Sequence, residues 1–263
     1  MRGGVMSDQT IQLMHGDCLF LLPLLPDNSI DLILTDLPYQ VTSCSWDVLI
    51  PFDILWGAYN RIIKPKQAIV LTATQPFTSM LISSNYRDFK YCWYWRKNQA
   101  TGFQNAKKQP LRIVEEAAVF MASSYYPQGL SRIDKKCRNS VSTGGNSLRT
   151  DVKESHSKGS LRTPGKDYIQ EYSGYPTNVL DVACDAEKLH PTQKPVALLE
   201  YLIRTYTNPG DTVLDSCMGS GSTAIACMRT GRRFIGIEKD EAYFRIASQR
   251  VKDEQKQGRL FTV

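Results

Sequence analysis

The residues best suited to chemistry are Asp36, Leu37, Pro38 and Tyr39, which follow the apolar residues Ile30, Leu32, Ile33 and Leu34. Asp36 offers a carboxylate, and Pro38 holds Leu37 in an extended backbone that fixes the direction of its carbonyl. Two such acceptors beside the flat ring of Tyr39 suit a planar amino group, such as the exocyclic amine of a nucleobase. By pulling on the amine hydrogens, they would restore the nitrogen lone pair and make it nucleophilic. A strand end closed by a proline turn is the alternative interpretation.

A second group of residues indicates a nucleotide-type cofactor. Asp215 ends a predicted strand at residues 212–215, and Gly219 and Gly221 lie in the loop that follows. Glycines let backbone amides approach a ligand at such a turn, and Glu238, at the end of the next strand, can accept both hydroxyls of a ribose. An alanine takes the third glycine position of Gly-x-Gly-x-x-Gly, and no Walker lysine follows the loop. Dinucleotide and P-loop sites are therefore disfavoured.

Strand and helix patterns alternate along the chain and predict an α/β fold that positions both groups. The apolar residues Ile30, Leu32, Ile33 and Leu34 are typical of a parallel strand buried on both faces. Ligands of open α/β sheets bind beyond the carboxyl ends of such strands. The other predicted elements are strands at 11–14, 68–72, 212–215 and 233–237, a helical turn at 19–25, helices at 52–63, 196–206, 224–229 and 240–251, and a hairpin pairing 89–95 with 115–121 at one sheet edge.

Both groups resemble motifs of the DNA methyltransferases that methylate amino groups. Residues 215–221 resemble their S-adenosylmethionine loop, and residues 36–39 resemble their catalytic motif. The catalytic motif comes first, a variable region follows, and His-Pro-Thr-Gln-Lys-Pro at residues 190–195 precedes the cofactor unit. This order resembles the β-class arrangement, and the resemblance covers roughly residues 10–122 and 189–255.

The resemblance implies a permuted seven-stranded, Rossmann-like methyltransferase sheet with an inserted target-recognition region. Residues 1–122 would form the catalytic half, residues 123–188 the insertion, and residues 189–263 the S-adenosylmethionine-binding half. The chain order agrees, because its last helix would lead directly into the strand at residue 11 if the termini were joined. The insertion lacks a sustained amphipathic period, which also fits a disordered linker.

The resemblance also implies roles for the cofactor-binding residues. Asp17 would hold the adenine and Glu238 the ribose, while Asp215 and the glycine loop would hold the methionine end. Thr192 and Lys194 would reach its carboxylate. Asp17 has an alternative role as the cap of the helical turn that follows it. The full predicted set is Asp17, Cys18, Thr192, Lys194, Asp215, Cys217, Gly219, Gly221, Ser222, Thr223 and Glu238.

Two positions depart from the family pattern. Leu37 stands where the family usually has proline, and Cys217 stands where it often has phenylalanine. Leucine supplies the same backbone carbonyl as proline, so we expect activity to survive. Asp36, in the place of a serine, resembles the adenine-N6 enzymes more than the cytosine-N4 enzymes. His190 is expected to be structural rather than a base.

The predicted reaction is methyl transfer from S-adenosylmethionine to N6 of an adenine flipped out of DNA. The amine would attack the sulfonium methyl in line, so no covalent enzyme intermediate is needed. Cytosine-C5 methylation is excluded because it requires a nucleophilic cysteine after proline, and none of the seven cysteines follows a proline. The alternatives are a cytosine-N4 enzyme, a methyltransferase acting on an RNA base or a protein amide, and a DNA-binding protein of this fold without turnover.

Positive charge clusters in two stretches although the net charge is only +6. Residues 90–112 hold six Lys or Arg and no Asp or Glu, and residues 128–166 hold nine against three. Such clusters point to a polyanion, with basic surface loops that bind nothing as the alternative. The residues predicted to contact DNA phosphates are Arg96, Lys97, Lys107 and Lys108. Base readout is predicted for the insertion.

The composition also predicts the cellular compartment and the binding partners. The cysteines form no Cys-x-x-Cys pair or zinc spacing, so no metal site is expected and the thiols are predicted to be reduced. No apolar run approaches ~20 residues, and no signal-peptide core is present. We therefore expect a cytoplasmic protein that binds DNA. A homodimer and a separately encoded cognate restriction endonuclease are further partners that this class allows.

Overall fold

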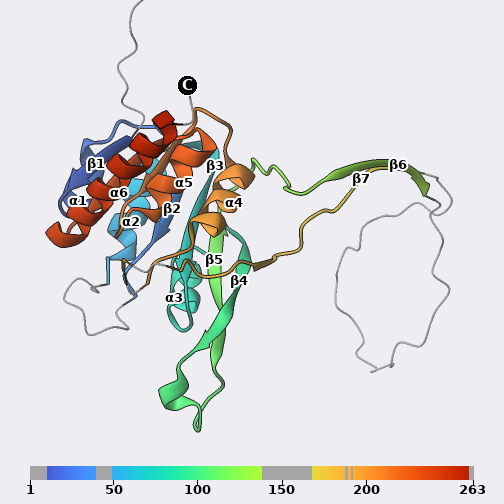
Figure 1. Cartoon of the computed structure of the whole chain (residues 1–263), viewed down its shortest axis with the longest axis horizontal. Helices are drawn as coiled ribbons and strands as arrows, with labels where there is room; N and C mark the ends of the chain where they lie inside the picture. The colour runs from blue at the N-terminus through green and yellow to red at the C-terminus, as the bar shows by residue number, and fades with distance from the viewer. Residues whose placement is uncertain (1–10, 40–48, 138–167, 187–188, 191, 261–263) are drawn as a thin grey trace, which may run out of the picture. The chain divides into compact units, whose positions relative to one another are not determined.

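The computed structural model describes residues 11–39, 49–137, 168–186, 189–190 and 192–260. They divide into two compact units, one drawn from residues 1–126 and 177–263 and the other from residues 127–176. The first unit holds a mixed sheet with helices on both faces (Figure 1).

The sheet has eight strands in the order β1-β10-β9-β2-β3-β5-β4-β8. Its parallel half consists of β1 (Ile11–His15), β10 (Arg233–Glu238), β9 (Thr212–Asp215), β2 (Ile30–Asp36) and β3 (Ile63–Ala73). β5 (Arg112–Phe120) runs antiparallel to both β3 and β4 (Phe89–Thr101), which confirms the predicted hairpin. The expected seven strands become eight, because the short β8 (Val179–Asp181) from the predicted insertion pairs in parallel with the outer edge of β4.

The first and last described strands of the chain, β1 and β10, are neighbours in the sheet, as the predicted permutation requires. β1 pairs in parallel with β10, with Ile11 opposite Phe234. α6 (Glu241–Leu260) follows β10 and contacts both strands, and α5 (Ser222–Thr230) lies between β9 and β10 in the chain. β10, α6 and β1 therefore occupy consecutive places in the fold.

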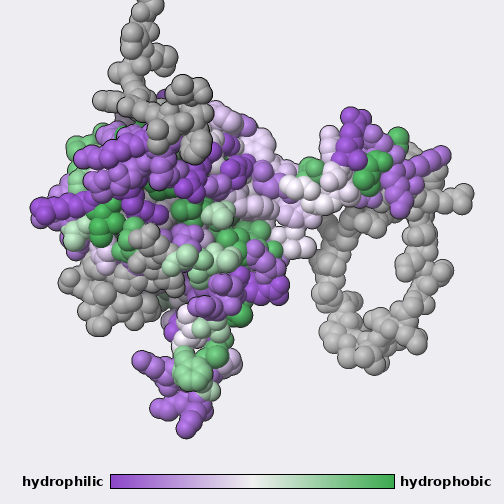
Figure 2. All heavy atoms as spheres, viewed as in Figure 1, coloured by the Kyte–Doolittle hydropathy of each residue, from purple (hydrophilic) through white to green (hydrophobic). Residues whose placement is uncertain are grey.

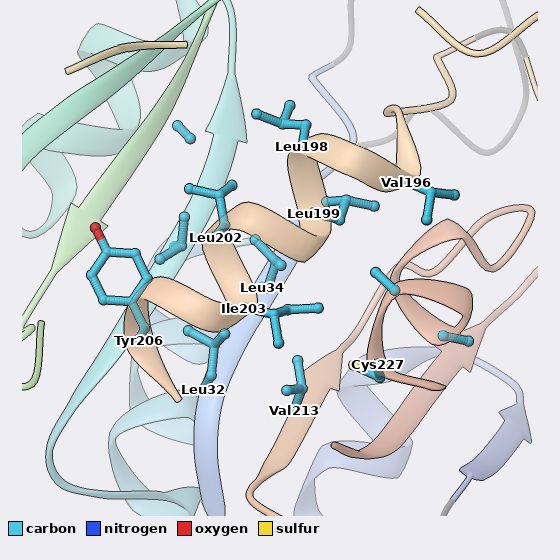
Figure 3. Packing of buried hydrophobic residues seen from close by; sticks show 14 of the residues in the cluster. Leu32, Leu34, Val196, Leu198, Leu199, Leu202, Ile203, Tyr206, Val213 and Cys227 are labelled. Atoms are coloured by element: carbon cyan, nitrogen blue, oxygen red, sulfur yellow. The ribbon is translucent and has the colours of Figure 1, made fainter. Parts of the chain in front are cut away.

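β2 is buried along nearly its whole length because helices cover both faces of the sheet. Leu32 and Leu34 lie in one cluster with Leu202 of α4 (Val196–Tyr206), as Figure 3 shows. Ile33 belongs to a second cluster, on the side of α2 (Phe52–Ile62) and α3 (Phe77–Ser84). Alternate residues of a strand face opposite sides, so a strand covered on both faces is apolar along most of its length. The buried charged exception in β2 is Asp31, which forms an ion pair with Lys64 Nζ at 2.6 Å. This confirms the predicted central strand, whose carboxyl end carries the candidate catalytic motif.

Three elements differ from the prediction. The sequence pattern does not indicate α3, which has only eight residues and mixes apolar residues with Ser and Thr. The helical turn predicted at residues 19–25 is split into α1 (Cys18–Leu21) and the 3-10 turn η1 (Leu22–Leu24), since Pro23 cannot continue an α-helix. β3 begins at Ile63, before the strand predicted at residues 68–72, and its first residues have an irregular register and Lys66 at φ +71°.

The second unit is an antiparallel pair of strands, β6 (Ser131–Cys137) and β7 (Tyr168–Ser173). Two glycines approach closely beside this pair, since a Cβ added to Gly174 would lie 2.6 Å from the carbonyl oxygen of Gly129. Residues 138–167 lie outside the described residues. The unit is shorter than the insertion predicted at residues 123–188, because residues 177–186 and 123–126 belong to the first unit.

Candidate active site

A cavity of about 440 Å³ opens at the carboxyl ends of β2, β9 and β10. Asp36, Asp215 and Glu238 end these three strands, and all three residues line the cavity. The walls also contain the rest of the predicted catalytic motif and every predicted cofactor residue except Gly221. Parallel strands that start from different parts of the sequence thus bring the two motifs to one edge of the sheet.

Asp36 is held from both sides by hydrogen-bond donors. Its Oδ1 accepts hydrogen bonds from the hydroxyls of Tyr39 and Thr72, and its Oδ2 accepts one from Lys194 Nζ at 2.7 Å. The Tyr39 ring packs on Phe77, with ring centroids 4.9 Å apart. Burial and the neighbouring Asp36 carboxylate raise the pKa of Tyr39 well above its usual value, so its hydroxyl stays protonated. Contacts within the protein therefore fix the side chains of Asp36 and Tyr39 without a ligand.

Lys194 lies among carboxylates, with only 6% of its side chain exposed. Besides Asp36, its Nζ is 3.5 Å from Glu115 Oε2. Burial alone would lower the pKa of Lys194, but Asp36 and Glu115 outweigh this and raise it. The structure thus places the ammonium on the candidate catalytic acid, whereas the resemblance implies a contact with the cofactor carboxylate.

Lys97 of β4 differs from its predicted role. Its side chain is 8% exposed, and its Nζ forms an ion pair with Glu115 Oε1 at 2.7 Å. Burial favours the neutral form of Glu115, but Lys194 and Lys97 overcome this and lower its pKa. The predicted phosphate contact of Lys97 is therefore corrected, because the ammonium is enclosed by the protein's own carboxylate.

Asp215 ties the two sides of the glycine loop together. Its Oδ1 accepts a hydrogen bond from the backbone N–H of Cys217 at 3.1 Å, and its Oδ2 accepts one from Thr223 Oγ1 at 2.6 Å. Burial, only partly offset by these hydrogen bonds, raises the pKa of Asp215 to about 7. The carboxyl group therefore shapes the loop between β9 and α5.

The loop between Cys217 and Ser222 needs its glycines for different reasons. Gly221 precedes α5 with φ +80°, and a Cβ there would lie 3.0 Å from the Cβ of Ala247 on α6. The Gly219 N–H donates to Glu238 Oε2 at 2.8 Å, while the Asp240 N–H donates to Oε1 at 2.7 Å. Burial, opposed by these backbone hydrogen bonds, raises the pKa of Glu238. The predicted ribose acceptor is thus oriented by backbone groups.

Asp17 caps α1, which confirms the alternative role that its position suggests. Its Oδ1 accepts from the Leu19 N–H at 2.9 Å, and its Oδ2 pairs with Lys239 Nζ at 2.9 Å. The carboxylate lines the cavity as well. Cys18 follows it as the first residue of the helix, and both Cys18 and Cys217 line the cavity.

The residues before α4 pack around one aromatic contact. The His190 and Tyr243 ring centroids are 4.2 Å apart, and the Thr192 N–H donates to His190 Nδ1 at 3.2 Å. Burial lowers the pKa of His190, which favours the neutral ring. This arrangement suits the structural role expected for His190 and places Thr192 at the cavity wall.

The remaining predicted DNA contacts lie on the hairpin formed by β4 and β5. Arg96 is exposed but forms a two-point ion pair with Asp181 of β8, at 2.5 and 2.8 Å. Lys107 and Lys108 are exposed in the connection that follows η2 (Phe103–Asn105) at the tip. Hydrophilic side chains gather at this tip in Figure 2.

Three residues of the site carry no motif signal. Glu115 lies within a predicted strand, and Phe77 lies in a helix that the sequence pattern does not indicate. Thr72 could have been found, because it ends the predicted strand at residues 68–72. Neighbouring parallel strands end at the same sheet edge, and Thr72 is the register partner of Asp36.

A family model described as DNA methylase, for N6 and N4 methyltransferases, matches residues 30–249. The chain belongs to the DNA methylase family. It is 27% identical over 261 residues to the DNA adenine methyltransferase YhdJ of Escherichia coli K12, a match that covers 91% of this chain and 82% of that protein. The family confirms the resemblance drawn from the two motifs.

Solved structures share the fold over most of the chain. The M1.HpyAVI–SAM complex matches with a TM-score of 0.58 and 24% identity, covering 91% of this chain and 99% of that one. The cytosine-N4-specific PvuII DNA methyltransferase matches with a TM-score of 0.62 and 16% identity, covering 95% and 94% of the two chains. Within the residues that the structure describes, no helix is long and apolar enough to cross a membrane.

Proposed function

We propose that this DNA methylase transfers a methyl group from S-adenosylmethionine to N6 of adenine in DNA. The observation that carries the proposal is the shared cavity, which joins the Asp36 motif to the glycine loop of a nucleotide-type site. The cavity volume of about 440 Å³ suits a cofactor site of ordinary size. When bound, S-adenosylmethionine supplies an electrophilic methyl group on a sulfonium.

The residues around the loop fit that cofactor. Gly219 lines the cavity without a side chain, and α5 begins at Ser222, directly after the loop. Acidic groups that suit an adenine amine and ribose hydroxyls line the same cavity at Asp17 and Glu238. Thr192 and Ser222 add hydroxyl groups to the wall. These groups would bind and orient the cofactor, and the residues of the catalytic motif would act on the target amine.

The chain's own part in the reaction is to prepare the target amine. Asp36 and the Leu37 carbonyl accept the two N6 hydrogens, while Tyr39 holds the flipped base by stacking. Extracting the base from the duplex costs a few kcal/mol, which DNA contacts must offset. Lys107 and Lys108 contribute phosphate contacts that orient the duplex without reading its sequence.

Adenine is favoured over cytosine by the acid at position 36 and by the similarity to YhdJ, whose name describes an adenine methyltransferase. Cytosine-N4 methylation is the second candidate, because the PvuII enzyme shares this fold and the chemistry of the exocyclic amine is the same. An RNA base or a protein amide would use the same acceptors, and product identity separates these cases.

The test is incubation with methyl-labelled S-adenosylmethionine and unmethylated DNA, followed by digestion and mass spectrometry of the nucleosides. We expect label in N6-methyladenine. Label in N4-methylcytosine would reassign the base and keep the mechanism. Cofactor binding without label in DNA would overturn the proposed substrate and direct the search to RNA or protein.

A further inference from the structure

Four charges, two buried and two partly buried, lie in a row from the hairpin to the catalytic motif. Lys97 pairs with Glu115 at 2.7 Å, Glu115 lies 3.5 Å from Lys194, and Lys194 pairs with Asp36 at 2.7 Å. The exposed fractions of these side chains are 8%, 18%, 6% and 22% in that order. The signs alternate and the charges cancel, as a buried group of charges requires.

Lys194 competes with the target amine for Asp36. One oxygen of the carboxylate already accepts two hydroxyl groups, and Lys194 takes the other. A carboxylate has about four acceptor positions, so one position remains for an incoming amine, on Oδ2 beside Lys194. An ammonium is a stronger donor than an amine, so Lys194 weakens this oxygen as an acceptor for the amine. A second carboxylate that shares Lys194 would reduce this competition.

We propose that Glu115 is a positioning residue for methyl transfer, which shares Lys194 with Asp36 and so leaves an oxygen of Asp36 available to the target amine. The inference rests on the role proposed above for Asp36. Lys97 supports it by fixing the other oxygen of Glu115, so that the carboxylate faces Lys194. Glu115 itself touches neither base nor cofactor in this role.

The neighbouring residue offers a matched control. Successive residues of a strand point to opposite faces of the sheet. Glu116 therefore faces α3, where Thr78 Oγ1 donates to its Oε2 at 3.2 Å. Glu116→Gln removes one charge from the same strand without touching the row of charges that reaches Asp36.

The experiment compares Glu115→Gln with the wild type in single-turnover methyl transfer to DNA. We expect the rate to fall by about 10- to 100-fold, as for other small misplacements of reacting groups. Cofactor affinity, measured by calorimetry, should stay unchanged. Glu115→Asp keeps the charge and should retain an intermediate rate. A rate for Glu115→Gln no lower than that of Glu116→Gln would overturn the proposal.

A double variant separates positioning from simple structural damage. If Glu115→Gln is slow because Lys194 then holds Asp36 too firmly, adding Lys194→Met should restore part of the lost rate. Damage to the fold alone would make the double variant slower than Glu115→Gln. The latter result would contradict the inference.

A measurement that does not depend on turnover distinguishes the role of Glu115 from the proposed function. In ¹⁵N spectra of lysine ammonium groups, the signal absent from Lys194→Met identifies Lys194. Its pKa should be lower in Glu115→Gln than in the wild type, and an unchanged pKa would overturn the claim that Glu115 holds Lys194. Failure of the wild type to methylate DNA would instead overturn the proposed function and, with it, the catalytic consequence.

Discussion

At the scale of single residues, Asp36 shows how the surroundings complete a motif. The sequence places the carboxylate at a strand end, and the fold surrounds it with Tyr39, Thr72 and Lys194. These three donors fix the orientation of its two oxygens. A neutral amide would accept less strongly and would turn its own donor group toward the site.

We therefore expect Asp36→Asn to slow methyl transfer by about 100-fold or more, because an oriented polar group that acts in the transition state is lost. Cofactor affinity should change little, since the glycine loop is untouched. Single-turnover kinetics and calorimetry measure the two effects. Asp53→Asn on the exposed side of α2 is the control, and normal turnover in Asp36→Asn would refute the role of Asp36.

Asp215 leads to a prediction about pH and stability. Its pKa is about 7 in the folded protein against an ordinary value of 3.8, so the folded state binds this proton more tightly than the unfolded chain. The free energy of unfolding should therefore fall as pH rises from about 4 to about 7, by up to ~1.4 kcal/mol per pH unit from this group. Above that range the contribution is constant.

Asp215→Asn removes this titration and keeps an oxygen that can accept from the Cys217 N–H. The difference in unfolding free energy between variant and wild type should move in favour of the variant as pH rises across this window. Urea denaturation at several pH values measures it. Parallel curves for the two proteins would show that Asp215 does not titrate there.

At the scale of elements, the start of α5 depends on its packing against α6. An alanine at position 221 would be strained by the left-handed backbone and would press on Ala247. We expect Gly221→Ala to lower the free energy of unfolding by about 1–3 kcal/mol, measured by chemical denaturation. Gly57→Ala in α2 is the control, because a Cβ there meets no atom within 4 Å and alanine favours a helix. Equal stability of both variants would contradict the argument.

The tip of the β4–β5 hairpin carries the remaining predicted phosphate contacts. If Lys107 and Lys108 each neutralise one phosphate, replacing either with Gln should reduce the salt dependence of DNA affinity by about one unit of slope. Fluorescence anisotropy at several salt concentrations gives the slope. Lys256→Gln on α6 is the control, and an unchanged slope for the hairpin variants would place the DNA elsewhere.

At the scale of the whole molecule, the second unit defines a segment that can be replaced with that of a related methyltransferase to test base readout. We propose that the predicted insertion reads bases, and residues 127–176 form its compact part. Replacing these residues with those of a relative should change the recognition sequence while leaving cofactor affinity intact. Sequencing of the methylated sites measures the change, and an unchanged site would assign readout to the first unit.

The sequence by itself determined the features that depend on neighbours in the chain. The apolar residues at positions 30 and 32–34 predicted the buried β2, and the spacing of Asp215, the glycines and Glu238 predicted the β9–α5–β10 unit. The order of the two motifs was enough to indicate the family and the permuted sheet. Local patterns suffice here because a strand buried on both faces and a turn before a helix each constrain a few adjacent residues.

Only the tertiary structure decided which charged groups meet. Lys97 looked like a phosphate contact and Lys194 like a cofactor contact, yet both lie beside Glu115. Asp36 and Lys194 are 158 residues apart in the chain. Their contact depends on how the segment before α4 lies over the end of β2, while the register of β5 between β3 and β4 places Glu115 beside Lys194. Burial then forces opposite charges to pair, and no local pattern in the sequence records which partners the fold will supply.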